Sequence, residues 1–176
     1  GPLYSSIRFT AFIVLTLVLH RKGRFEPSYF GPLVVESMIY AAIASVLVYF
    51  ALKGLHLKPA FAPPKPGLAP VVSALGEAVN EETLFRWILL EVLFLFAHRV
   101  GTLRPLVARS LAVLVGAACF AAVGTFLAPL ASNDMVGVAG RLFTLGVAGV
   151  FFGVLYFLRG YPACAYTHVF YATFWG

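Results

Sequence analysis

The chain has 176 residues, of which 61% are hydrophobic and only 11% are charged. Soluble domains are roughly 45–50% apolar and 25% charged, and a small soluble protein cannot bury this much apolar surface. The composition therefore excludes an ordinary soluble domain and predicts an all-α polytopic membrane protein. The apolar runs are continuous, whereas the strands of a membrane barrel alternate. The net charge of +6 comes from Lys and Arg clusters between apolar runs, which are typical of loops at a membrane surface and not of a nucleic-acid site.

About six apolar helices are expected. The first covers residues 7–20, which is short for a membrane span, and the second covers 33–55. The stretch 56–70 is too rich in proline to be helical, so we expect an extended loop there. The next helix begins near Ser73, a plausible N-cap, and runs to about Phe96. The remaining apolar runs cover 106–130, 138–158 and 163–174.

The helix that follows the proline-rich loop contains an unusual cluster of charges. Four of the seven carboxylates of the chain lie in it, together with one arginine: Glu77, Glu81, Glu82, Glu91 and Arg86. A charged side chain at a bilayer centre costs about 2.5–3.5 kcal/mol on insertion scales, and such side chains usually mark a functional site.

The spacing within this cluster suggests a division of roles. Glu82 and Arg86 are four residues apart, so a helix brings them together as an ion pair. Glu77 and Glu81 share a neighbouring face. We therefore expect Arg86 to pair with Glu82, while Glu81 acts as a general base. The alternative is a purely structural cluster of ion pairs that holds the helices together.

His168 is a second candidate site residue, because it lies in the middle of the last apolar run and not at its end. His98, beside Arg99, is expected to be a solvated helix-end residue. Cys119 and Cys164 lie in apolar runs without a spacing motif, so we expect small buried hydrophobes. The sequence contains no His-Glu-x-x-His pair, and neither a metal nor another cofactor is predicted.

Two segments resemble the CPBP family of intramembrane glutamic proteases, which includes the Rce1-like CAAX prenyl endopeptidases, the Abi proteins and the myxosortase-type enzymes. Residues 81–86 are similar to its Glu-Glu-x-x-x-Arg motif, and residues 153–168 are similar to its glycine-containing helix, short turn and final histidine. The resemblance implies one membrane domain, 1–176. Its N-terminal spans and proline-rich loop would cover 1–72, and its core 73–172.

The resemblance also implies a catalytic set of Glu81, Glu82 and His168. In this set Glu81 activates water, His168 stabilises the oxyanion, and Glu82 is supported by Arg86. Glu77, which shares a helix face with Glu81, is expected to be a further supporting residue. The implied activity is cleavage of a membrane-anchored peptide or protein. The implied partners are membrane lipid and that substrate, and the implied location is the cytoplasmic membrane of a bacterium or archaeon.

The sequence departs from the family pattern at two positions. The Phe-x-x-x-His motif aligns best with the segment from Phe120 to Gly124, so glycine stands where histidine is expected. Ala172 stands where an asparagine is expected after the final histidine. We expect the missing imidazole to be replaced by water in the space that Gly124 leaves, or by the hydroxyl of Thr125 or Tyr171.

His98 is a further auxiliary candidate, because Phe94 and His98 also fit the Phe-x-x-x-His pattern. However, an unbroken helix would place His98 about 24 Å from Glu82, so it reaches the site only if the helix breaks. Two other functions remain open at this point. One is a non-catalytic immunity or scaffold protein with the same fold, and the other is a small transporter that uses Glu81 as a proton relay.

Overall fold

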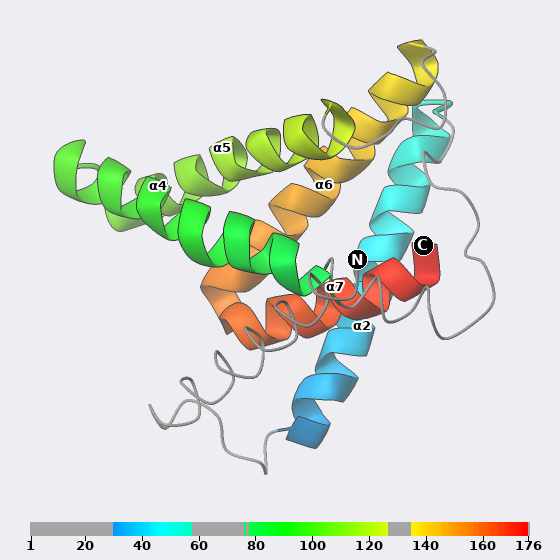
Figure 1. The fold of residues 1–176 in the computed structure, drawn as a ribbon, viewed down its shortest axis with the longest axis horizontal. Coiled ribbons are helices and arrows are strands. Elements are labelled where there is room, and N and C mark those ends of the chain that lie inside the picture. The colour runs from blue at the N-terminus through cyan, green and yellow to red at the C-terminus, as the bar shows by residue number, and fades with distance from the viewer. Residues whose placement is uncertain (1–29, 58–75, 77, 127–134, 176) are drawn as a thin grey trace, which may run out of the picture.

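The computed structural model describes residues 30–57, 76, 78–126 and 135–175, and these residues form helices without any strand. The elements are, in chain order, α2 (Phe30–Gly54), η2 (Glu82–Leu90), α4 (Glu91–Leu95), η3 (Phe96–Val100), α5 (Pro105–Phe126), α6 (Met135–Arg159) and α7 (Tyr161–Trp175) (Figure 1). The predicted all-α class is thus confirmed. The predicted helix at 7–20, most of the proline-rich loop and Glu77 lie outside the described residues.

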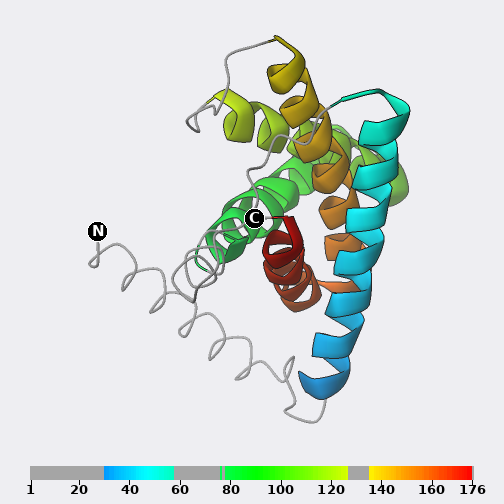
Figure 2. The same cartoon turned by 90° about the vertical axis from the view of Figure 1, so that its right-hand side faces the viewer.

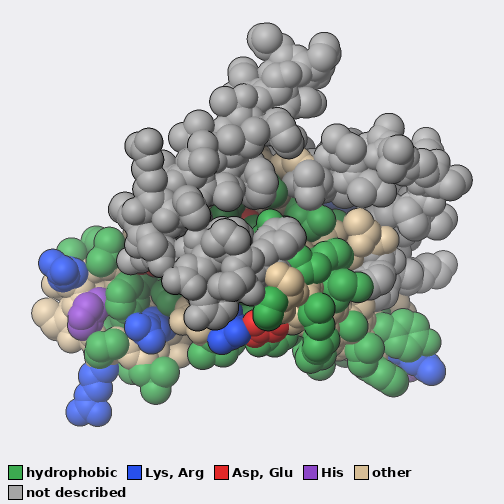
Figure 3. Space-filling view, turned by 90° about the horizontal axis from the view of Figure 1, so that it is seen from below, with side chains coloured by type: hydrophobic (Ala, Val, Ile, Leu, Met, Phe, Trp, Pro, Cys, Tyr) green, Lys and Arg blue, Asp and Glu red, His purple; other side chains and the backbone are tan. Residues whose placement is uncertain are grey.

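Three of the described helices are long and apolar enough to cross a membrane: Gly31–Gly54, Pro105–Phe126 and Gly137–Arg159. They correspond to the predicted runs at 33–55, 106–130 and 138–158. Large apolar side chains on them are exposed, for example Phe50, Leu106 and Leu158. Hydrophobic side chains also cover much of the described surface in Figure 3. A surface of this kind is stable in contact with lipid and not with water.

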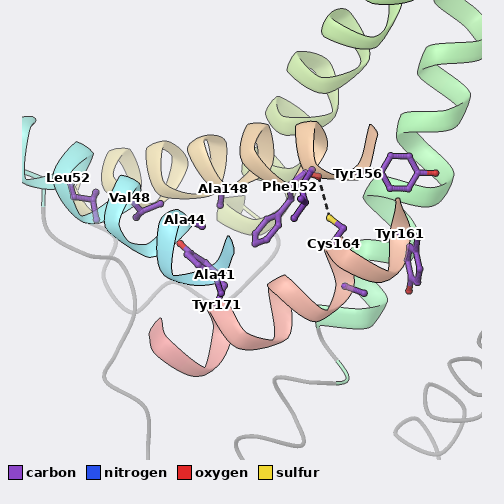
Figure 4. Packing of buried hydrophobic residues seen from close by; sticks show 12 residues of the cluster. Ala41, Ala44, Val48, Leu52, Ala148, Phe152, Tyr156, Tyr161, Cys164 and Tyr171 are labelled. Carbon is purple, nitrogen blue, oxygen red and sulfur yellow. Dashed lines mark hydrogen bonds between the residues drawn. The ribbon is translucent and has the colours of Figure 1, made fainter. Parts of the chain in front are cut away.

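An apolar core of the described residues lies where α2, α6 and α7 meet. The face that α2 turns towards α6 and α7 consists of apolar residues at helical spacing, two of them small: Ala41, Ala44, Val48 and Leu52 (Figure 4). Small residues let membrane helices approach closely. The core therefore holds α7 firmly against α2 and α6, and α7 is the helix that carries His168.

The turn between α6 and α7 is very short. α6 ends at Arg159, α7 begins at Tyr161, and Gly160 between them has a φ of 83°, a left-handed conformation that glycine adopts without a steric penalty. Pro162 follows in the first turn of α7, where its fixed φ suits a helix start. The short turn expected within residues 153–168 is confirmed. It sends α7 back between η2 and α2, as Figure 2 shows.

The charged helix is continuous. Residues 78–81 are helical and lead directly into η2, α4 and η3. η2 and η3 are π-helical, with backbone bonds over five residues, such as Gly101 N–H to Phe96 O at 3.0 Å. π-helical turns occur frequently at functional sites. Because the helix does not break, His98 lies at its far end from Glu82.

α5 and α6 are in close contact where Gly149 faces Ala117. A Cβ atom added at Gly149 would lie 2.9 Å from the Cα atom of Ala117, which is a backbone atom that cannot rotate away. By contrast, a Cβ atom at Gly146 of the same helix would meet no atom of the described chain within 4 Å. Glycine at 149 therefore sets the distance between α5 and α6.

We expect Gly149→Ala to lower the free energy of unfolding by about 1–3 kcal/mol, which is typical of overpacking. The measurement is a thermal melt in detergent, with Gly146→Ala as the matched control. Gly146→Ala should melt at or slightly above the temperature of the parent, since alanine favours the helix. Equal melting temperatures for the two variants would contradict the close contact at Gly149.

Candidate active site

Glu82 is the centre of a buried polar cluster between η2 and α7. Its side chain is 0% exposed. Its Oε1 atom lies 2.7 Å from Nδ1 of His168, and its Oε2 atom accepts a hydrogen bond from Sγ of Cys164 at 2.8 Å. Nε of Arg86 lies 3.5 Å from the same Oε2 atom. A buried carboxylate needs such partners, because burial without them is costly.

Arg86 is almost completely buried, with 1% of its side chain exposed. The predicted ion pair between Arg86 and Glu82 is confirmed by the Nε–Oε2 distance. The guanidinium group also lies over the ring of Phe120 at 4.3 Å and near the ring of Phe152 at 5.6 Å. Contacts of this type favour a cation that has been removed from water. Arg86 thus balances the charge of Glu82 and packs between aromatic rings.

His168 is fixed by aromatic rings as well as by Glu82. Its ring stacks on Phe152, with centroids 4.9 Å apart and planes inclined by 24°. The edges of Phe120 and Tyr171 lie around it, with ring centroids at 6.4 and 6.5 Å. These contacts leave the imidazole little freedom to rotate, and they direct its second nitrogen away from Glu82.

That second nitrogen points towards Glu81. Nε2 of His168 lies 3.7 Å from Oε2 of Glu81, so these two members of the implied catalytic set lie together. The side chain of Glu81 is 42% exposed, in contrast to the fully buried Glu82. The two adjacent carboxylates therefore lie in different environments, with one imidazole between them. Of the two, Glu81 is the more accessible carboxylate.

Tyrosine hydroxyl groups connect the charged helix to α6 and α7 on either side of this cluster. The hydroxyl of Tyr161 lies 2.8 Å from that of Thr83, and Tyr156 donates a hydrogen bond to Glu91 at 2.8 Å. Bonds between helices of this kind fix the rotation of the helix that carries the carboxylates. They also give Glu91, the last carboxylate of the predicted cluster, a structural partner outside the site.

Gly124 faces α6, where a Cβ atom at this position would lie 2.7 Å from Cδ1 of Leu145, the end of a flexible side chain. The replacement of the missing imidazole by water beside Gly124 stays a prediction. Thr125 is buried, and its hydroxyl has no hydrogen-bond partner among the described residues. Tyr171 is the auxiliary candidate whose ring borders His168, with ring centroids 6.5 Å apart. Ala172 is partly buried on α7.

His98 does not join the site. Its Nδ1 atom lies 2.8 Å from the carbonyl oxygen of Leu103, and its ring stacks on Phe94 with centroids 5.5 Å apart. These contacts occupy the imidazole at the turn between η3 and α5. His98 is therefore a helix-end residue, although the local contacts make it partly buried and not fully solvated.

Cys164 is the site residue that the sequence analysis missed. It was expected to be a small buried hydrophobe; it is buried, and its thiol also donates a hydrogen bond to Glu82. A signal was present in the spacing, since Cys164 precedes His168 by four residues and both therefore lie on one face of α7. In the part of the chain that the structure describes, no three His, Cys, Asp or Glu side chains are arranged to hold a metal ion.

The fold and this cluster define the class of protein: a helical integral membrane protein with two carboxylates and an imidazole gathered between its helices. Residues 63–174 match the family model described as type II CAAX prenyl endopeptidase Rce1-like. This match covers more than half of the chain, and the chain belongs to that family. No curated protein and no solved structure matches it. The resemblance inferred from the sequence is thus confirmed, and the family is one of CAAX-type intramembrane proteases that act on peptide substrates.

Proposed function

We propose that this protein is a glutamate-type intramembrane endopeptidase that cleaves a membrane-anchored peptide or protein. The observation that carries the proposal is the position of His168 between two carboxylates. Its Nδ1 atom lies 2.7 Å from the buried Glu82, and its Nε2 atom lies 3.7 Å from the partly exposed Glu81. The name of the family supports the reaction class, and the geometry supports the assignment of roles.

In this mechanism Glu81 is the general base. It takes a proton from a water molecule, and the water oxygen attacks the scissile carbonyl carbon. The carbonyl oxygen becomes an oxyanion, which accepts a hydrogen bond from Nε2–H of His168 in its imidazolium form. Glu82 accepts Nδ1–H from the same ring and balances its charge. When the peptide bond breaks, Glu81 returns the proton to the leaving amine.

The mechanism has fewer donors than the family pattern implies, because Gly124 and Ala172 lack the expected side chains. The hydroxyl of Tyr171 is the auxiliary donor that we favour, since its ring borders His168. Loss of one oxyanion donor typically lowers the rate by about 10²–10³-fold. We therefore expect a slow enzyme.

A non-catalytic immunity or scaffold protein is not the favoured alternative. A purely structural cluster of ion pairs would need one carboxylate to balance the charge of Arg86, and Glu82 alone fills that role. A second carboxylate, Glu81, directed at the other side of His168 is expected of a reactive site. The nature of the substrate's membrane anchor, and the assignment to the cytoplasmic membrane of a bacterium or archaeon, stay predictions.

We expect His168→Ala to lower the rate of cleavage by at least about 10²–10³-fold, because it removes the oxyanion donor. The measurement is cleavage of tagged, membrane-anchored candidate substrates in cells that co-express the protein, at matched membrane levels. Glu91→Gln is the control, since it alters a carboxylate of the same helix that Tyr156 binds outside the site. Cleavage by His168→Ala at the rate of the parent would exclude the mechanism. A parent that binds a candidate and cleaves none would support the scaffold function.

A further inference from the structure

The two oxygens of Glu82 are held by different residues. Oε1 contacts the imidazole of His168, whereas Oε2 faces Cys164 and Arg86. The Sγ–Oε2 distance is 2.8 Å, and the Nε–Oε2 distance to Arg86 is 3.5 Å, which is long for a hydrogen bond. Arg86 thus supplies charge, and the Cys164 thiol supplies the short, directional contact to Oε2.

The thiol of Cys164 has one proton and two acceptors within reach. Besides Glu82, the carbonyl oxygen of Phe152 lies 3.3 Å from Sγ, a contact drawn in Figure 4. The carboxylate is closer and carries a charge, and charge-assisted hydrogen bonds are the stronger ones. The thiol of Cys164 therefore donates its hydrogen bond to Glu82 and not to the Phe152 carbonyl. The Phe152 carbonyl confines the sulfur from the other side.

The backbone places the thiol and the imidazole together. The N–H of Cys164 bonds to the carbonyl of Gly160 at 3.3 Å, in the first turn of α7, and His168 follows one turn later. One rigid helix therefore presents both donors to the two oxygens of Glu82. Because the two oxygens are joined in one planar group, a donor that fixes Oε2 also fixes the direction of Oε1.

From this arrangement we infer that Cys164 is a positioning residue of the active site. Its thiol holds the Glu82 carboxylate in the rotation at which Oε1 accepts from Nδ1 of His168, and it thereby aims Nε2 at the reaction centre. The inference rests on the proposed function for its catalytic consequence. The positioning of His168 is independent of that function and can be measured without a substrate.

A merely space-filling role is distinguishable from positioning by two substitutions. Cys164→Ser keeps a donor of similar size, whereas Cys164→Ala removes the donor and leaves a small apolar side chain. Cys119→Ala is the matched control, because Cys119 is the other free cysteine of the described chain and lies on α5, away from the helix that carries Cys164 and His168. Relative to the parent, we expect Cys164→Ala to lower kcat about 10–100-fold, the range known for partners that orient a ligating histidine. We expect KM to stay within about twofold, and Cys164→Ser to restore most of kcat.

The second measurement is the ¹⁵N spectrum of the histidine rings in detergent, with the signals of His168 assigned by their loss in His168→Gln. Cys164→Ala should shift the His168 ring signals, and Cys164→Ser and Cys119→Ala should leave them as in the parent. The inference is overturned by unchanged His168 signals in Cys164→Ala, or by equal loss of kcat in the serine and alanine variants. If the parent cleaves no substrate, the proposed function fails, and the spectrum alone decides on the positioning role.

Discussion

Glu81→Gln is expected to lower the rate of cleavage by about 10²–10⁴-fold, the contribution typical of a general base, and to leave the melting temperature in detergent unchanged. The reason is the difference between two adjacent carboxylates. Glu81 has 42% of its side chain exposed, so the neutral amide costs little stability there. Steady-state kinetics on a cleaved substrate and thermal melts of the same preparations measure the two effects.

Glu82→Gln provides the comparison. This substitution removes the negative charge beside Arg86 in a fully buried position, and an uncompensated buried charge destabilises a protein by about 3–5 kcal/mol. Glu82→Gln should therefore lose both stability and activity, whereas Glu81→Gln loses only activity. Full activity in Glu81→Gln, together with a folded but inactive Glu82→Gln, would transfer the role of base to Glu82.

The fold was largely predictable because the membrane imposes a strong constraint on sequence. The apolar runs at 33–55, 106–130 and 138–158 each correspond to a helix of membrane-spanning length, and the short turn expected within residues 153–168 lies at Gly160. The π-helical form of η2 and η3 was not predictable. The pattern of apolar residues does not distinguish an α-helix, with hydrogen bonds over four residues, from a π-helix, with hydrogen bonds over five. Both forms satisfy the backbone hydrogen bonds within a single helix.

The site was predictable where it depended on local spacing and less so where it depended on contacts between helices. The pair of Glu82 and Arg86 follows from their separation along one helix. The short contact between Glu82 and His168 joins residues 86 positions apart in the sequence. Only the packing of α7 against η2 decides which nitrogen of the His168 ring each carboxylate contacts. The approach of Leu145 to Gly124 likewise depends on how α5 meets α6.

Arg86→Ala is expected to lower the free energy of unfolding by about 3–5 kcal/mol, because it leaves Glu82 buried without its cation. A loss of this size is a large part of the stability of a typical domain. The measurement is the yield of folded protein in detergent, followed by a thermal melt of what is recovered. Arg104→Ala is the control, since Arg104 is exposed at the turn before α5.

Arg86→Lys separates the two contributions of this side chain. Lysine keeps the positive charge but lacks the planar group that lies 4.3 Å over the ring of Phe120. We expect Arg86→Lys to fall between the parent and Arg86→Ala in melting temperature. A lysine variant as stable as the parent would show that charge alone is required.

The double variant Glu82→Gln, Arg86→Met tests whether the pair acts as a unit. Removing both charges leaves no uncompensated ion, and the exchange of a buried ion pair for neutral residues of similar volume is often close to neutral in stability. The double variant should therefore be more stable than Glu82→Gln alone or Arg86→Met alone. Its cleavage rate should stay low because His168 has lost the charge of Glu82. A double variant with the summed destabilisation of the two single variants would mean that Glu82 and Arg86 are not energetically coupled, despite the 3.5 Å between them.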